Sequence, residues 1–228
     1  MNDQISKAVI TPEVMAKTID HTVLKPDAVP GDLDVLTDEA RAHGFCAVCV
    51  NSCHVVLVGE RLKGSDVHVC TVVGFPLGAM HPKAKACEAE IAVENGASEI
   101  DMVLNVGALI SGELKTAEAD ILEVRQAIGA SSVLKVIIET CLLTDKEKVL
   151  ACNIAASAGA DFVKTSTGFS SGGATVEDVR LMKQTVGDNL QVKASGGIKD
   201  WRTAAGMLRA GATRIGTSAG VAILQDAP

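Results

Sequence analysis

The sequence predicts a single α/β domain folded as a (β/α)8 TIM barrel, and three observations support that fold class. Glycine ends a helix-like pattern and leads into strand-forming residues at four places, Gly44, Gly96, Gly159 and Gly211. A further strand candidate lies about halfway between successive glycines, so the repeating unit is about 28 residues long. Eight such units fit within 228 residues, and this fold begins at about 200 residues.

The eight strands are expected in order along the chain, each followed by a helical pattern. Their predicted ranges are 17–22, 45–50, 67–73, 99–105, 133–138, 161–165, 190–194 and 213–217. Between them, "PKAKACEAEIAVEN" and "DKEKVLACNIAASA" carry apolar residues at three- and four-residue spacing, which is typical of helices. Regular alternation of strand and helix implies a parallel sheet. An open doubly wound sheet is the alternative, but "IDHTVLKP" lacks its glycine fingerprint.

The composition is consistent with one barrel domain over residues 1–228, with a short segment, 1–16, before the first strand. Hydrophobic residues make up 47% of the chain, aromatic residues only 2%, and tyrosine is absent. The core is therefore expected to be aliphatic. Length alone leaves one large domain or two small ones, and the repeat favours one.

Charge and hydropathy exclude several classes of partner. The net charge is −7 and no basic stripe is present, so no nucleic-acid partner is expected. No apolar run reaches the roughly 18 residues that span a membrane. The N-terminus lacks the apolar region of a signal peptide, so a cytoplasmic location is expected.

The seven cysteines are expected to be reduced thiols, because their number is odd and they lie within apolar segments. One cluster, "FCAVCVNSCH", raises the alternative of a zinc site formed by Cys46, Cys49, Cys53 and His54. In a strand, however, Cys46 and Cys49 point to opposite faces, and no second Cys/His pair follows at finger spacing. Buried thiols are therefore favoured, and no metal or cofactor is expected.

Lysines mark the expected active site, which in such barrels lies at the C-terminal ends of the strands. Strands five to seven contain Lys135, Lys164 and Lys193, although lysine is depleted in strands and rarely buried. A single one could extend to water, but Lys164 and Lys193 occupy matching positions on adjacent strands. Two ammonium groups in a confined space lower the pKa of one amine, which then becomes a nucleophile. The loop after Lys164, "TSTGFSSGGAT", offers no acidic partner, so this lysine is expected to be unpaired.

Asp101, in "EIDMVLN", is expected beside the lysines. It could simply neutralise their charge, because structural ion pairs are common. A carboxylate next to two amines is also what a proton shuttle requires.

Two loops of small residues predict a phosphate site. "SGG", with Gly196 and Gly197, follows the seventh strand, and "GTSAG", with Gly216 and Ser218, follows the eighth. Glycines let backbone N–H groups converge on an anion, and phosphate sites in this fold use these two loops. A plain tight turn is the weaker alternative.

Five motifs, "VGFPLG", "EIDMVLNVGAL", "KVIIET", "GADFVKTSTGF" and "VKASGGI", together resemble the 2-deoxyribose-5-phosphate aldolase family over essentially the whole domain. The resemblance implies a cofactor-free class I aldolase, a lyase that reversibly joins acetaldehyde to glyceraldehyde 3-phosphate. It makes Lys164 the Schiff-base lysine, Lys193 its perturbing and proton-relaying partner, and Asp101 the general acid/base. The substrate- and phosphate-binding residues expected with them are Gly168, Gly196, Gly197, Gly216, Ser218, Asp20 and Lys135.

One residue departs from the family pattern. Some relatives carry a basic residue after "TSTG", where this chain has Phe169. Phosphate affinity is then expected to depend more on backbone donors and on Ser218.

The mechanism implied by the resemblance begins with an imine between Lys164 and the open-chain sugar. The protonated imine serves as the electron sink for carbon–carbon cleavage, and the bond expected to break is C3–C4. The expected partners are small phosphorylated sugars and aldehydes, with a homodimer as the expected assembly. Two other functions stay open. One is a different phosphate-binding lysine barrel, such as a transaldolase-like or keto-acid aldolase, and the other is a non-catalytic phosphate- or metal-binding protein.

Overall fold

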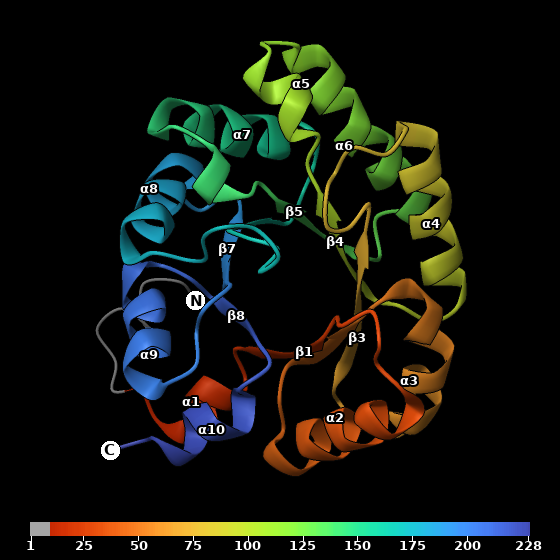
Figure 1. Ribbon diagram of the computed structural model, residues 1–228, viewed down its shortest axis with the longest axis vertical. Helices are drawn as coiled ribbons and strands as arrows, with labels where there is room; N and C mark the ends of the chain where they lie inside the picture. The colour runs from red at the N-terminus through yellow and green to blue at the C-terminus, as the bar shows by residue number, and fades with distance from the viewer. Residues whose placement is uncertain (1–9) are drawn as a thin grey trace.

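The protein is a closed barrel of eight parallel strands that pair in sequence order, with β1 closing onto β8. The computed structural model describes residues 10–228, so residues 1–9 of the expected N-terminal segment lie outside the described part (Figure 1). The strands are β1 (Ile19–Val23), β2 (Ala47–Val50), β3 (His68–Val73), β4 (Glu99–Val103), β5 (Val133–Ile137), β6 (Phe162–Lys164), β7 (Gln191–Ser195) and β8 (Arg214–Thr217).

Helices form a ring around the barrel (Figure 1). They are α1 (Pro12–Ala16), α2 (Pro30–His43), α3 (Val55–Arg61), α4 (Pro82–Glu94), α5 (Val106–Ile110), α6 (Leu114–Ile128), α7 (Asp145–Ser157), α8 (Val176–Val186), α9 (Trp201–Ala210) and α10 (Gly220–Gln225). Two short 3-10 turns, η1 (Ser52–His54) and η2 (Thr140–Leu142), follow β2 and β5. The predicted (β/α)8 fold is confirmed.

Local sequence signals explain where the elements begin and end. The four repeat glycines all have positive φ; at Gly44, which ends α2, φ is 62°. At the start of α7, Thr144 and Glu147 form a reciprocal capping box that satisfies N–H groups of the first turn. Strand ends differ from prediction by up to two residues. β4, for example, ends at Val103, because a helix starts three residues later.

The core has two parts that differ in chemistry. Between the strands and the helices lies one large cluster dominated by aliphatic residues, as expected from the composition. Inside the barrel, the apolar cluster is small and consists of Leu24, Ala47, Cys49, Cys70 and Val72. Charged side chains occupy the rest of the interior and lead directly to the functional site. None of the helices within residues 10–228 has the length and apolar character needed to cross a bilayer.

Candidate active site

Lys164 lies at the end of β6, beside Lys193 on β7 in the strand register. The matching positions expected from the sequence are therefore confirmed. Lys164 is 3% exposed and lines a pocket of about 740 Å³. Lys193 is completely buried and does not line this pocket. Of the two amines, Lys164 is the one that a substrate in the pocket can reach.

Asp101 on β4 joins these lysines. Its Oδ2 atom accepts hydrogen bonds from Lys164 Nζ at 2.8 Å and from Lys193 Nζ at 2.7 Å. Its Oδ1 atom accepts one from Lys135 Nζ at 2.8 Å. The expectation that Lys164 is unpaired is wrong. Only its own loop lacks acidic residues, and closure of the barrel brings Asp101 to it from two strands away.

The network continues toward the N-terminal ends of the strands. Lys193 Nζ also donates to Asp20 Oδ2, and Arg214 NH1 donates to Asp20 Oδ1 at 2.7 Å. Glu99 pairs with Lys135 Nζ at 2.6 Å and with Arg214 NH2 at 3.1 Å. Every carboxylate of this group therefore contacts at least two cationic side chains.

These contacts determine the protonation of the buried groups. Burial alone raises the pKa of Asp101, but Lys135, Lys164 and Lys193 outweigh it and hold that pKa well below its usual range. Burial alone lowers the pKa of Lys193, yet Asp101 and Asp20 raise it above its usual value. Asp101 is thus a carboxylate and Lys193 an ammonium group at neutral pH.

The small-residue loops that were expected to bind phosphate line the same pocket. Gly168, Gly196, Gly197, Gly216 and Ser218 all line it. The N–H groups of four of them have no acceptor within residues 10–228; these are Gly168, Gly196, Gly197 and Ser218. Unpaired N–H groups around one pocket are the arrangement that anion sites in proteins use.

Gly216 also has a packing role. A Cβ at this position would lie 2.9 Å from Ser195 Cβ and 3.1 Å from Lys193 Cε. Only glycine leaves room for the Lys193 side chain to pass β8.

Asp20 and Lys135 lie elsewhere. Both are completely buried and neither lines the pocket, so the structure places them away from any phosphate in it. Asp20 holds Lys193 and Arg214, while Lys135 holds Glu99 and Asp101. Both therefore hold charged neighbours of Lys164 inside the barrel.

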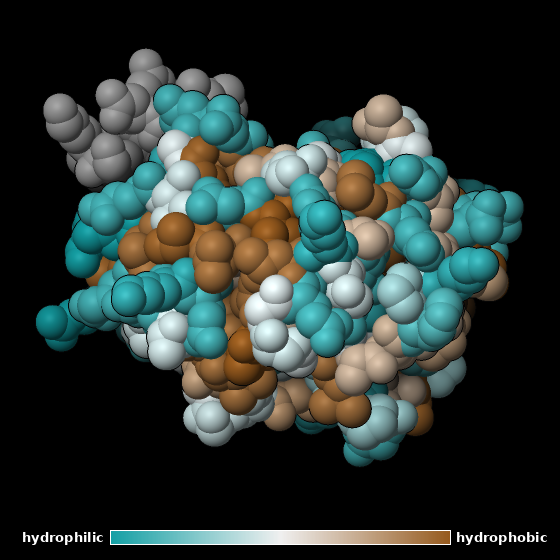
Figure 2. All heavy atoms as spheres, turned by 90° about the horizontal axis from the view of Figure 1, so that it is seen from above, coloured by the Kyte–Doolittle hydropathy of each residue, from teal (hydrophilic) through white to brown (hydrophobic). Residues whose placement is uncertain are grey.

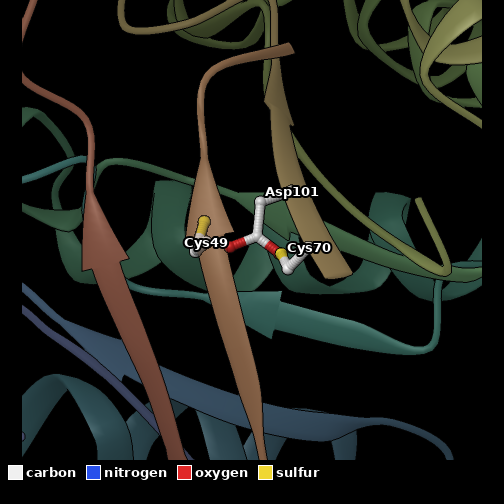
Figure 3. A group of neighbouring side chains, drawn as sticks. All are labelled: Cys49, Cys70 and Asp101. Atoms are coloured by element: carbon white, nitrogen blue, oxygen red, sulfur yellow. The ribbon is translucent and has the colours of Figure 1, made fainter. Parts of the chain in front are cut away.

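Two cysteines also border the network. Cys49 on β2 and Cys70 on β3 are direct register partners, and with Asp101 they form a group whose ligand atoms lie within 4.8 Å (Figure 3). Burial and the hydrogen bond with Cys49 raise the pKa of Cys70 well above its usual value. The Cys70 thiol donates to Asp101 Oδ1 at 3.2 Å, and Lys135 Nζ lies 3.4 Å from its sulfur. A protonated thiol next to an ammonium group is unsuited to a metal cation.

The zinc alternative considered from the sequence is not supported either. Within residues 10–228, Cys46, Cys53 and His54 belong to no group of converging metal-type ligands. Cys53 is exposed, whereas Cys49 faces the barrel interior.

Three members of the network, Glu99, Cys70 and Arg214, were not expected from the sequence. Glu99 carried a usable signal, because residues two apart on a strand share a face and Asp101 follows it at that spacing. Lys25 and Lys199 also line the pocket as exposed cations on two different loops. They carry positive charge near the small-residue loops, whereas Phe169 carries none.

Known proteins resemble this chain over nearly its full length. Residues 14–226 match the model of the DeoC/LacD family aldolases. The deoxyribose-phosphate aldolase of Brevibacillus brevis is 60% identical over 213 residues, which cover 93% of this chain and 96% of the relative. The enzyme of the same name from Streptococcus gordonii is 59% identical, covering 92% and 94%. The solved deoxyribose phosphate aldolase of Aeropyrum pernix, described as tetrameric, superposes with a TM-score of 0.90 at 33% identity, covering 98% of this chain and 94% of that one.

Proposed function

Because the chain belongs to the DeoC/LacD family of aldolases, we propose that it cleaves 2-deoxyribose 5-phosphate through a Schiff base on Lys164. The reaction is a reversible retro-aldol cleavage, so the enzyme is a carbon–carbon lyase. Its products are acetaldehyde and glyceraldehyde 3-phosphate. The phosphate-binding loops and the names of the relatives favour this substrate over those of other lysine barrels.

The charge balance inside the barrel carries the assignment of Lys164. Four cationic side chains, Lys135, Lys164, Lys193 and Arg214, meet three carboxylates, Asp20, Glu99 and Asp101. If all are ionised, one positive charge is in excess, and a buried excess charge is costly. Loss of one proton from a lysine restores neutrality.

Lys164 is the lysine with the fewest carboxylate contacts. Within residues 10–228 it contacts one carboxylate, whereas Lys193 contacts two and Lys135 three. It is also the one of these three that borders the pocket. A neutral amine next to substrate is the nucleophile that imine formation requires.

The chemistry then follows from atom balance. Lys164 Nζ attacks C1 of the open-chain aldehyde, and water leaves as the iminium forms. Acetaldehyde contains C1 and C2 only, so the bond that breaks is C2–C3, and the cleavage expected at C3–C4 is wrong. The C3 hydroxyl loses its proton as C3 becomes the aldehyde of glyceraldehyde 3-phosphate, and the C2–C3 electrons form the enamine.

The remaining steps return the enzyme to its starting state. Protonation of the enamine at C2 and hydrolysis of the imine release acetaldehyde and regenerate the amine. Asp101 alone is a weak base, because the positive charges of Lys135, Lys164 and Lys193 outweigh the effect of burial and hold its pKa low. We therefore assign the proton transfers to Asp101 and Lys193 together, acting through a water molecule. Asp20 and Lys135 fix the positions of Lys193 and Asp101.

Borohydride trapping tests the proposal directly. Reduction in the presence of acetaldehyde or deoxyribose 5-phosphate should yield one stable adduct, which peptide mapping places on Lys164. Lys164→Arg keeps the charge but removes a usable nucleophile, so adduct and turnover should both disappear. Lys146→Arg, on an exposed position of α7, is the matched control and should retain both. An adduct on Lys193 or Lys135, or turnover in Lys164→Arg, would overturn the assignment.

We also propose that the chain forms a homodimer. Figure 2 shows hydrophobic residues gathered between polar ones on the face seen from above. Large exposed hydrophobic residues include Ile110 on α5, Leu142 on η2 and Leu150 on α7. Extended apolar surface on a soluble protein favours association. Light scattering should give about twice the chain mass of 23.5 kDa, whereas a monomer or a tetramer would contradict the dimer.

A further inference from the structure

Glu139 has a backbone conformation that is otherwise confined to glycine within residues 10–228. Its φ is 55° and its ψ is 67°, in the left-handed region, two residues after the end of β5 and directly before η2. This conformation costs a side-chain-bearing residue roughly 1–2 kcal/mol. Strain of this kind persists where the surrounding structure requires it, and such places are often functional.

The carboxylate of Glu139 is buried and binds the loop that follows Lys164. The residue is 4% exposed, and Thr167 N donates to both carboxylate oxygens at 3.3 Å. The hydroxyl of Thr167 donates to Oε2 as well. None of the ion pairs within residues 10–228 involves Glu139. Within the described chain the carboxylate is therefore held mainly by Thr167, with one longer contact from the Cys141 thiol to Oε1 at 3.9 Å.

An ionised carboxylate accepts hydrogen bonds and cannot donate them. The Thr167 hydroxyl must therefore point its proton at Glu139, which leaves an oxygen lone pair for the N–H of Phe169, 3.1 Å away. The N–H groups on either side of Gly168 are thus both taken. That of Gly168 has no acceptor within residues 10–228, and Gly168 lines the main pocket.

Glu139 acts on this loop from behind. It does not line the 740 Å³ pocket, but it borders a second pocket of about 120 Å³ together with Thr167 and Phe169. Phe169 in turn meets Phe75 edge to face, with ring centroids 5.1 Å apart. The loop is held on its other side by Thr165 Oγ1, which donates to Ser195 O at 3.0 Å.

We propose that Glu139 is a positioning residue that sets the conformation of Thr167–Phe169 and so presents the N–H of Gly168 to the substrate phosphate. The inference deepens the proposed function and rests on it. Because Phe169 carries no charge, this loop depends on correctly oriented backbone donors to bind a phosphate. The strained backbone of Glu139 lets a side chain from the end of β5 point across to the loop after β6.

Two variants separate the carboxylate from the backbone strain. Glu139→Gly relieves the positive φ and removes the carboxylate, so a loss of function cannot arise from added strain. Glu139→Gln keeps the length and one acceptor but offers a donor where Thr167 needs a second acceptor. Glu90→Gln, at an exposed carboxylate on α4, is the matched control.

The measurement compares 2-deoxyribose 5-phosphate with unphosphorylated 2-deoxyribose. We expect KM for the phosphorylated sugar to rise about tenfold in Glu139→Gly, which corresponds to one lost hydrogen bond to a charged group. In Glu139→Gln the rise in KM should be smaller. KM and kcat for 2-deoxyribose should change less than about threefold. Glu90→Gln should match the wild type on both sugars.

Borohydride trapping with acetaldehyde distinguishes failure of this inference from failure of the proposed function. Glu139→Gly should still form the Lys164 adduct, because the nucleophile and Asp101 are untouched. The positioning role is overturned if the adduct forms but KM for the phosphorylated sugar is unchanged. It is also overturned if KM rises equally for both sugars. Absence of an adduct in the wild-type enzyme would instead overturn the proposed function.

Discussion

Lys164 and Lys193 are register partners on β6 and β7, and both donate to the same oxygen, Oδ2 of Asp101. A single carboxylate thus holds together two amines that would repel each other as ammonium ions. The two differ in their other contacts. Lys193 is additionally paired with Asp20 and fully buried, whereas Lys164 borders the pocket. This asymmetry supports the proposal that Lys193 is the fixed charge and Lys164 the reactive amine.

Replacement of Lys193 tests the role of that fixed charge. In Lys193→Leu we expect turnover at neutral pH to fall about 100-fold or more and to recover partly in alkaline buffer, because the positive charge of the register partner of Lys164 is removed. Lys193→Arg keeps the charge and should retain more activity and more borohydride adduct. The measurement is kcat against pH from 6 to 10. A profile in Lys193→Leu that stays flat points to a proton relay alone.

Replacement of Asp101 should affect both turnover and stability. Asp101→Asn leaves three buried lysines without the carboxylate they share, so we expect a fall in kcat of about 10²–10⁴ and a lower Tm. The control is Asp145→Asn, at a side chain that is 82% exposed, which should change neither. Unchanged kcat in a stably folded Asp101→Asn would show that Asp101 only balances charge.

A bulky side chain at Gly197 should weaken binding of the phosphorylated sugar selectively. No atom lies within 4 Å of a Cβ at this position, so Gly197→Leu has space but extends into the pocket mouth. We expect KM for deoxyribose 5-phosphate to rise about tenfold or more, with less change for an unphosphorylated aldehyde. Gly64→Leu controls for backbone strain. Gly64 is exposed, and its φ of 75° is close to the 78° of Gly197. Equal losses on both substrates would mean that the loop is structural.

Acid should unfold the protein partly through Asp20. Burial raises the pKa of this carboxyl, but Lys193 and Arg214 lower it to about 2, below its usual 3.8. A lowered pKa stabilises the folded state above the unfolded pKa, and this contribution, roughly 2 kcal/mol, is lost as the pH falls from about 4 toward 2. Chemical denaturation gives the free energy of unfolding at each pH between 5 and 2. Its decrease with falling pH should be less steep in Asp20→Asn than in the wild type. An equally steep decrease in both proteins would show that Asp20 does not contribute to acid unfolding.

Chelation should leave the activity unchanged. The electron sink in the proposed mechanism is the iminium, and the thiol of Cys70 lies beside Lys135, where a cation is disfavoured. We expect the same retro-aldol rate with and without excess EDTA, and no stoichiometric metal in the purified protein. A rate that falls with chelator and returns with a divalent ion would contradict this.

Much of the fold and the centre of the site followed from local patterns in the sequence. The glycine repeat and the alternating periodicities each depend on neighbouring residues, so they predict eight strand–helix units without knowledge of contacts. Parallel strands bring their C-terminal ends together, which is why Lys164, Lys193 and the small-residue loops could be grouped in advance. Strand ends were less certain, because they depend on pairing with neighbours.

Only the tertiary structure decided how the charges are paired and which residues reach the substrate. Closure of the barrel places Asp101 against Lys164, Lys193 and Lys135, although these residues are 34 to 92 positions apart in the chain. It also buries Asp20 and Lys135 below the pocket and turns Glu139 toward the loop after β6. Pairing of buried charges depends on atomic distances and on exclusion of water, and neither is encoded in the local pattern around any one residue.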